Sequence, residues 1–384
     1  MMSFSSQIRE FSFESKASQI LPGASEYTCA KHKAHFVREQ ERMLFRGENI
    51  FCPDLEVLEN KKFSYQILCP SGATGIKRVI LMFHGFNEKD WAKYLPWAEA
   101  ICASTGSSVL MFPIAFHMQR APKLWSNPRA MYALCKDRKL KHPLVNQASL
   151  SNVAISMRIH TLPQRFIWSG LQSYYDVIQL LRECKLGVHP LLNIDTQFDI
   201  FAYSIGGFLA LTLKLCNFDD YFKQSRVCLF CSGAFLKDLA PVSKFILDSE
   251  AYAALYAYVI TDYQKHLHSD NLLQHYMSSA HPEGQLFSSL FETANLKDTR
   301  EHLLKQYARQ IYAISLSKDS VIPAAGVRSL LHGDKQDIDI RVDELDFDRE
   351  YTHEDPFSFA SSDNPESRQN FEQVFQRVCE FYRS

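Results

Sequence analysis

The chain has 384 residues, of which 46% are hydrophobic and 22% charged, and its formal net charge is −1. This composition predicts a soluble globular protein with one large core or two smaller ones. The near-zero charge provides no overall field that would favour nucleic acid or an anionic membrane as a partner.

Ten cysteines are spread along the chain without regular spacing. A chain of this length does not need disulfides for stability, so these cysteines are expected to be reduced thiols. The first residues lack a continuous apolar segment, and no run of 18 apolar residues occurs in the sequence. We therefore expect no signal peptide, no transmembrane segment and a cytoplasmic location.

Residues 1–60 are predicted to form an N-terminal extension ahead of the first clear strand, and residues 61–384 the main domain. Within the extension, residues 25–45 are typical of a helix docked on the main domain. His32 and His35 have a spacing that can hold a metal ion, but no carboxylate or cysteine completes a ligand set on that helix. A solvated helical face is the better interpretation, and we expect neither a metal nor a cofactor.

A buried strand is predicted at residues 78–83, where the sequence reads RVILMF, and it leads directly into a histidine-glycine motif, His84-Gly85-Phe86. A glycine at this point lets the backbone turn back sharply. The N–H of Phe86 can then donate a hydrogen bond to negative charge that develops during a reaction. Phe86 is therefore a candidate for one half of an oxyanion hole.

The segments around this motif alternate between strand and helix. A strand is predicted at residues 62–69, a helix at 91–103, a strand at 108–114 and a helix at 169–184. Such alternation favours a doubly wound, mostly parallel sheet, in which the functional site lies at the carboxyl ends of the strands.

Residues 118–165 interrupt this pattern with nine Lys or Arg residues against one acid. The insertion starts at the carboxyl end of a strand, so His117 and Arg120 are expected beside the site. Arg120 there could hold a carboxylate or phosphate with paired hydrogen bonds and select an anionic substrate. A solvated face is the commoner reason for such a run of basic residues, and both interpretations stay open.

The sequence DIFAYSIGGFLALTLKL, residues 199–215, is typical of a buried strand that turns tightly into an apolar helix. Ser204 stands at the turn, and small residues lie two positions before and after it, Ala202 and Gly206, as such a crowded turn requires. The N–H of Ile205 would point outward at the helix N-terminus and serve as the second oxyanion donor. Ser204 is the predicted nucleophile.

Past this turn, another core strand is predicted at residues 226–235. Residues 236–309 are mostly helical in pattern and would cover the site as a cap. Two further strands, at 311–316 and 338–345, lead to acidic and histidine-containing turns. The chain ends in a helix with Asn364 as its N-cap and Pro365 in its first turn.

Three reactive side chains, Ser204, Asp319 and His353, each follow a buried strand. A serine hydroxyl needs a base near neutral pH, most often an imidazole, and the imidazole needs a carboxylate to fix its tautomer and stabilise its cation. The three are therefore the candidate nucleophile, acid and base. Asp238 is an alternative acid, which is less favoured because it lies further from the end of its strand.

These motifs together resemble those of the α/β-hydrolase superfamily, over about residues 62–384. They are His84-Gly85-Phe86, Ala202-Tyr203-Ser204-Ile205-Gly206, Lys318-Asp319-Ser320-Val321-Ile322-Pro323 and His353-Glu354-Asp355-Pro356. More narrowly, the chain resembles bacterial α/β hydrolases described only as domains of unknown function. The resemblance implies an α/β-hydrolase fold and a serine hydrolase that acts on a carboxylic ester or a related acyl compound. A serine at the turn, in place of aspartate, argues against the dehalogenase and epoxide-hydrolase branches.

Substrate identity is left open by the sequence. Amide, thioester and C–C hydrolysis and acyl transfer use the same groups, and a non-catalytic ligand- or partner-binding protein can retain them. Candidate substrate contacts, besides His117 and Arg120, are His84, Asn87 and Tyr203. The expected partner is a small acyl compound, which the basic insertion would favour in anionic form. The oligomeric state is not indicated.

Overall fold

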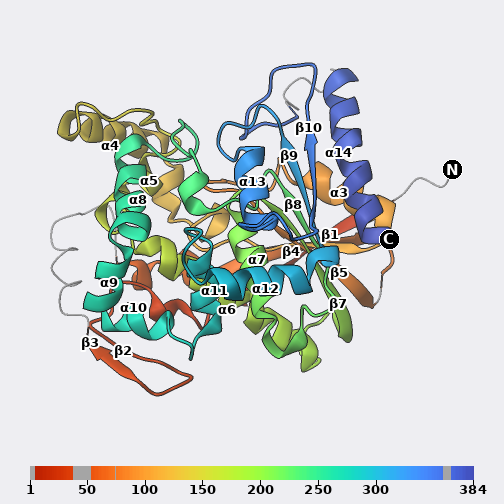
Figure 1. Ribbon diagram of the computed structural model, residues 1–384, viewed down its shortest axis with the longest axis horizontal. Helices are drawn as coiled ribbons and strands as arrows, with labels where there is room; N and C mark the ends of the chain where they lie inside the picture. The colour runs from red at the N-terminus through yellow and green to blue at the C-terminus, as the bar shows by residue number, and fades with distance from the viewer. Residues whose placement is uncertain (1–4, 38–52, 74, 358–364) are drawn as a thin grey trace.

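The computed structural model describes residues 5–37, 53–73, 75–357 and 365–384 (Figure 1). Its main sheet has eight strands in the order β1-β4-β6-β5-β7-β8-β9-β10. β4 runs antiparallel to β1 and β6, and the pairs from β6 to β10 are parallel. The strands are β1 (Ser6–Glu14), β4 (Lys62–Pro70), β5 (Ile76–Phe83), β6 (Ser108–Met111), β7 (Leu192–Tyr203), β8 (Val227–Phe230), β9 (Ile311–Leu316) and β10 (Arg341–Leu345).

Helices cover both faces of this sheet. The central strands β6 and β8 are buried at every position, because α3 and α14 pack on one face and α6 and α7 on the other. The helices are α2 (Leu58–Lys61), α3 (Leu95–Thr105), α4 (Pro128–Lys141), α5 (Val153–Thr161), α6 (Arg165–Lys185), α7 (Gly206–Cys216), α8 (Ser249–Tyr256), α9 (Tyr263–Ser269), α10 (Asn271–Tyr276), α11 (Pro282–Ser289), α12 (Lys297–Gln306), α13 (Ala324–Leu331) and α14 (Pro365–Arg383).

The strand order, with a single antiparallel strand next to one edge, is that of the α/β-hydrolase fold, as the sequence motifs implied. In such a sheet the carboxyl ends of β5, β7, β8 and β9 meet at the same edge, which is where the functional site is expected. Within the described ranges, no helix is both long enough and apolar enough to cross a bilayer. The nine cysteines of these ranges are all free thiols.

The basic insertion and the helical cap pack together as one layer beside the sheet (Figure 1). Arg138 of α4 donates two hydrogen bonds, from Nε and Nη2, to the carboxylate of Asp248, which is the N-cap residue of α8. The Nη2 atom lies 2.6 Å from Asp248 Oδ1. Both side chains are almost completely buried. The insertion therefore supports the cap through a buried ion pair, and Arg138 is the basic residue that forms it.

Two predictions for the N-terminal segment are wrong. β1 pairs with β4 at the sheet edge, so the segment contributes a strand that was not expected. The helix predicted over residues 25–45 is replaced, as far as residue 37, by an antiparallel hairpin of β2 (Glu26–Thr28) and β3 (His35–Val37). Lys33, with φ 60°, adopts the left-handed conformation that its turn requires, and Tyr27 is buried. Residues 38–45 and the predicted N-cap Asn364 lie outside the described residues.

Candidate active site

Ser204 lies on a sharp turn between β7 and α7. Its φ is 54°, a left-handed conformation that is uncommon for a residue with a side chain. The chain passes so close to its neighbours that a Cβ on Gly206 would lie 2.9 Å from the carbonyl oxygen of His84, and one on Gly207 would lie 2.0 Å from Ser232 Oγ. Glycine is therefore required at Gly206, where the clash is with backbone, and a side chain at Gly207 would displace the Ser232 hydroxyl that donates to the Ser204 carbonyl at 2.5 Å.

Ser204, His353 and Asp319 form one hydrogen-bonded chain. His353 Nε2 lies 2.7 Å from Ser204 Oγ, and His353 Nδ1 lies 2.8 Å from Asp319 Oδ2. The second oxygen of Asp319 accepts from the N–H groups of Val321 and Ile322, both at 2.9 Å. All three side chains are buried. The carboxylate thus has one oxygen fixed by its own turn and the other available to orient the imidazole.

The alternative acid, Asp238, does not reach His353. It lies in the short helical turn that follows β8, and its carboxylate pairs with Lys237 at 3.5 Å. The geometry therefore brings together the three residues that the sequence favoured.

Tyr203 positions His353 and does not face a substrate. Its ring stacks on the His353 ring at a centroid distance of 5.4 Å and an interplanar angle of 16°, and its hydroxyl donates to the His353 carbonyl. Burial raises the pKa of Tyr203 well above its usual value, so the hydroxyl remains a donor. The interpretation of Tyr203 as a substrate contact is wrong, because the whole side chain is buried beneath the histidine.

His84 is also committed to the fold. Its Nε2 accepts from the N–H of Ile114 at 2.9 Å, and its Nδ1–H donates to the carbonyl of Gly85 at 2.7 Å. Burial lowers the pKa of His84 to about 3, which keeps the ring neutral. With both nitrogens bound and the residue fully buried, His84 holds the turn after β5 in place, and its interpretation as a substrate contact is wrong.

Asn87 fastens the surrounding layer to the same turn. Its Nδ2 donates to the carbonyl of Ser151 in the insertion at 3.1 Å and to that of Phe245 in the cap at 2.6 Å. Nearby, Ser243 Oγ of the cap donates to Glu354 Oε1 at 2.5 Å. These bonds occupy Asn87, so it too is not a substrate contact, and they fasten the insertion and the cap to the loops that carry Phe86 and His353.

A narrow cavity of about 50 Å³ adjoins the site. Ser204 and His353 are not part of its wall, which reaches the site through Phe86 and Ile205. Among the described residues, the backbone N–H groups of Phe86 and Ile205 have no hydrogen-bond partner. These two donors therefore remain available beside the serine.

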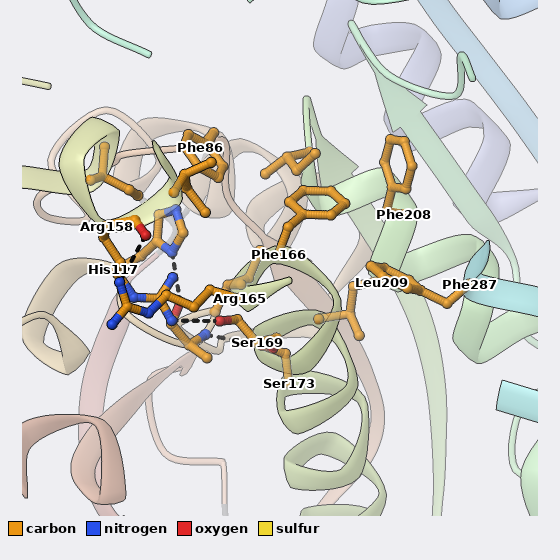
Figure 2. A pocket seen from close by; sticks show the side chains of 16 residues that line it. Phe86, His117, Arg158, Arg165, Phe166, Ser169, Ser173, Phe208, Leu209 and Phe287 are labelled. Carbon is orange, nitrogen blue, oxygen red and sulfur yellow. Dashed lines mark hydrogen bonds between the residues drawn. The ribbon is translucent and has the colours of Figure 1, made fainter. Parts of the chain in front are cut away.

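The cavity wall has a polar side and an apolar side (Figure 2). His117, Arg158, Arg165 and Ser169 lie together at one side, and Phe208, Leu209 and Phe287 lie at the other. A Cβ on Gly170 would come 2.4 Å from the ring of Phe287, so glycine allows the two helices to meet at this wall. The full lining is Phe86, Ile114, Ala115, His117, Ile155, Arg158, Ile159, Arg165, Phe166, Ser169, Gly170, Ser173, Ile205, Phe208, Leu209 and Phe287.

Arg120 does not line this cavity, so its interpretation as a selector of anionic substrates is wrong. The side chain is 0% exposed, and its Nη2 donates to Asp176 Oδ2 at 2.7 Å. Its remaining nitrogens donate to Asn60 Oδ1 at 3.1 Å and to the carbonyl of Pro113 at 3.0 Å. The guanidinium joins the insertion to α2 and α6 as an internal support.

His117 does line the cavity. Its Nδ1–H donates to the carbonyl of Ala115 at 2.8 Å, and its Nε2 has no hydrogen-bond partner although the residue is only 6% exposed. Burial, followed by the influence of His84, holds the pKa of His117 well below its usual value. The neutral ring therefore presents an acceptor nitrogen, which suits a hydroxyl or N–H group and not an anion.

Arg158 is the part of the wall that the sequence interpretation missed. It lies on α5 between Ile155 and Ile159, which also line the cavity, and its Nη2 binds Asp54 at 2.7 Å and Ser169 Oγ at 2.9 Å. The two isoleucines are four residues apart, the spacing of a buried helix face, and a basic residue within that turn is the pattern that could have placed Arg158 inside.

Comparisons with known proteins return family and fold matches, and no curated protein matches the chain. Among solved structures, esterase Est22 has a TM-score of 0.47 at 11% identity over 98% of this chain and 81% of that chain. A cold-adapted esterase from an Arctic intertidal metagenomic library has a TM-score of 0.40 at 10% identity, over 99% and 96% of the two chains. A carboxyl esterase from the fungus Tuber melanosporum has a TM-score of 0.40 at 13% identity, over 83% and 81%.

A family model described as "Family of unknown function (DUF6051)" matches residues 1–383. The match includes the N-terminal strand, the hairpin, the basic insertion and the cap. It also includes Ser204, Asp319 and His353. The chain therefore belongs to this family of unknown function, DUF6051.

Proposed function

We propose that the protein is a serine hydrolase that cleaves a carboxylic ester of a short acyl group through an acyl-enzyme. The observation that carries the proposal is the chain of hydrogen bonds from Ser204 Oγ through both nitrogens of His353 to Asp319, with distances of 2.7 and 2.8 Å. A serine activated by an imidazole that is itself oriented by a carboxylate is the arrangement that acyl transfer requires.

Each group has a role in this reaction. Ser204 Oγ attacks the ester carbonyl while His353 Nε2 takes its proton, and Asp319 stabilises the imidazolium that forms. The N–H groups of Phe86 and Ile205 would donate to the oxyanion of the tetrahedral intermediate. His353 then protonates the leaving alcohol, and afterwards it activates the water that releases the acid and restores the serine.

The cavity supports a short acyl chain. The cavity is small, about 50 Å³, which favours a short acyl group over a long chain. Its apolar side, formed by Phe208, Leu209 and Phe287, suits methyl and methylene groups. His117 Nε2, on the polar side, favours an acyl group that carries a hydroxyl or N–H donor near its end. With Arg120 internal and His117 an acceptor, neither residue supports an anionic preference.

Labelling with a fluorophosphonate probe and hydrolysis of p-nitrophenyl esters from acetate to octanoate test this function. We expect the wild type to be labelled at one serine and to prefer the shortest esters. Ser204→Ala should lose both properties, and the control Ser269→Ala, at an exposed serine of α9, should keep both.

A wild type that is neither labelled nor active on any ester would contradict the proposal. It would favour the alternative that the fold binds a ligand without catalysis. Equal labelling of Ser204→Ala would place the nucleophile elsewhere.

A further inference from the structure

A second group of reactive side chains lies where the β2–β3 hairpin meets the cap helices α10 and α11. Cys29 and His32 lie in the hairpin and His275 lies on α10. His281 immediately precedes α11. One ligand atom from each of the four lies within 4.8 Å of every other. Figure 1 shows the β2–β3 hairpin beside α10.

The spacing of these atoms is close to that of the corners of a metal-centred tetrahedron. His281 Nε2 lies 3.1 Å from His32 Nδ1, 3.1 Å from His275 Nε2 and 3.6 Å from Cys29 Sγ, while Cys29 Sγ lies 3.8 Å from His32 Nδ1. Zinc–nitrogen bonds of about 2.0 Å and zinc–sulfur bonds of about 2.3 Å place tetrahedral ligands roughly 3.3–3.6 Å apart. Every pair lies within 4.8 Å, so the side chains would draw closer at the wider separations to bind a single ion.

Hydrogen bonds alone do not explain the group. His281 Nδ1 lies 2.8 Å from Glu283 Oε1, so the proton of a neutral His281 ring is on Nδ1 and Nε2 carries a lone pair. That lone pair faces two other imidazole nitrogens at nearly equal distance, and it can accept from only one of them well. A central cation would bind all of these lone pairs at once.

Glu283 and Tyr175 complete the surroundings that a metal-binding histidine usually has. Glu283 is buried, its Oε1 faces His281 Nδ1, and the same oxygen accepts from the Tyr175 hydroxyl at 2.5 Å. A carboxylate behind a ligating histidine fixes the tautomer of its ring and strengthens it as a ligand. A Cys29 thiolate and the Glu283 carboxylate would together balance the two charges of a divalent ion.

We propose that Cys29, His32, His275 and His281 bind one Zn²⁺ ion. Four protein ligands leave no open position, so the ion would be structural, and it would tie the N-terminal hairpin to the cap. The set differs from the pair His32 and His35 considered in the sequence, because His35 lies on β3 and bonds Thr28 Oγ1 at 3.1 Å. The proposal is independent of the hydrolase function.

Metal analysis of the purified full chain tests this site. After dialysis against metal-free buffer, mass spectrometry should find one zinc per wild-type chain, whereas Cys29→Ser and His32→Ala should lose most of it. His32 is exposed, so its substitution should leave the fold intact by circular dichroism. His35→Ala is the matched control in the same hairpin, and Ser204→Ala should keep a full equivalent of zinc.

Replacement of zinc by Co²⁺ gives a second readout. Wild type should show the visible absorption of four-coordinate Co²⁺ and a thiolate charge-transfer band that Cys29→Ser removes. Glu283→Gln should bind about 10–100-fold more weakly, because it weakens the support behind His281. A folded wild type that holds no zinc and gives no cobalt spectrum would overturn the proposal, as would Cys29→Ser with unchanged metal content and spectrum.

Discussion

Two groups of polar side chains differ in how their atoms are paired. One is the strand-end site, formed by Ser204, His353 and Asp319, and the other is the hairpin–cap cluster, formed by Cys29, His32, His275 and His281. Around Ser204, every donor has an acceptor: the Ser204 hydroxyl donates to His353, His353 donates to Asp319, and the amides of Val321 and Ile322 donate to the other oxygen of Asp319. In the cluster, three imidazole nitrogens and a thiol converge on one point without a matching set of protons. The first arrangement is complete with protein atoms alone, and the second would be completed by the cation proposed above.

The difference shows how the pairing of polar atoms would separate the proposed reacting site from the proposed metal site. A catalytic chain needs protons that can move between matched partners, whereas a structural metal site needs several lone pairs aimed at one centre. Four predictions test this distinction, from the largest expected effect to the smallest.

Ser204→Ala separates the two regions most strongly. Removal of the nucleophile should lower kcat on any acyl substrate by on the order of 10⁴ or more, because the serine and its base act as a unit. Thermal stability and metal content should hardly change. Initial rates on p-nitrophenyl acetate, measured beside Ser269→Ala, check the prediction, and a variant with full esterase activity would refute the assignment.

Arg120→Leu tests whether the ion pair of Arg120 with Asp176 only stabilises the fold and takes no part in substrate binding. The substitution leaves the Asp176 carboxylate buried without its cation and should destabilise the protein by about 3–5 kcal/mol. Urea unfolding measures this loss, and activity per folded molecule should be unchanged. The double variant Arg120→Leu with Asp176→Leu should recover much of the stability. A selective loss of activity on charged esters would restore the substrate-binding interpretation.

Acidification tests the protonation pattern around His84. The folded protein keeps His84 neutral, with a pKa of about 3 against 6.5 when unfolded, so the unfolded state binds more protons between these values. Stability is therefore present above pH 6.5 and lost as the pH falls toward 3. Between pH 6.5 and 5, His84 alone should account for about 1.6 kcal/mol of the loss, and His117 and His189, whose pKa values burial also lowers, add to the total measured by urea unfolding. His84→Gln should show a smaller loss over the same interval, and an identical slope would argue against this role.

Tyr203→Phe has the smallest expected effect. It keeps the stacked ring and removes the hydroxyl that donates to the His353 carbonyl, which should cost about 1 kcal/mol of stability. kcat should fall by no more than about tenfold with KM unchanged, because the residue positions His353 without touching substrate. A rise in KM with constant kcat would indicate a direct substrate contact.

Much of the fold and the serine site can be predicted from the sequence because both follow from buried strands. Apolar runs such as residues 78–83 and 311–316 mark the parallel strands, and the reactive residues follow their ends. What cannot be predicted is where a side chain points after the strand ends. Arg120 and Tyr203 stand near the site in sequence, yet their functional groups turn into the core.

The hairpin–cap cluster shows a different limit. Cys29 and His32 are separated by two residues, which is a recognisable spacing, but His275 and His281 lie more than 240 positions further along the chain. Nothing in a single sequence links these two pairs. The expected helix over residues 25–45 also paired His32 with His35. In the hairpin, His35 pairs with Thr28 and is not one of the four clustered residues.

The bonds from Asn87 to Phe245 and from Ser243 to Glu354 have a consequence for how fast the proposed enzyme could turn over. They hold the cap against the loops that carry Phe86 and His353, and Ser204 is only 6% exposed. An ester that entered beside Phe245 would have to part these polar contacts, and its product would leave by the same route. Lid opening would then limit turnover more than acyl chemistry does, and the rate would fall as solvent viscosity rises.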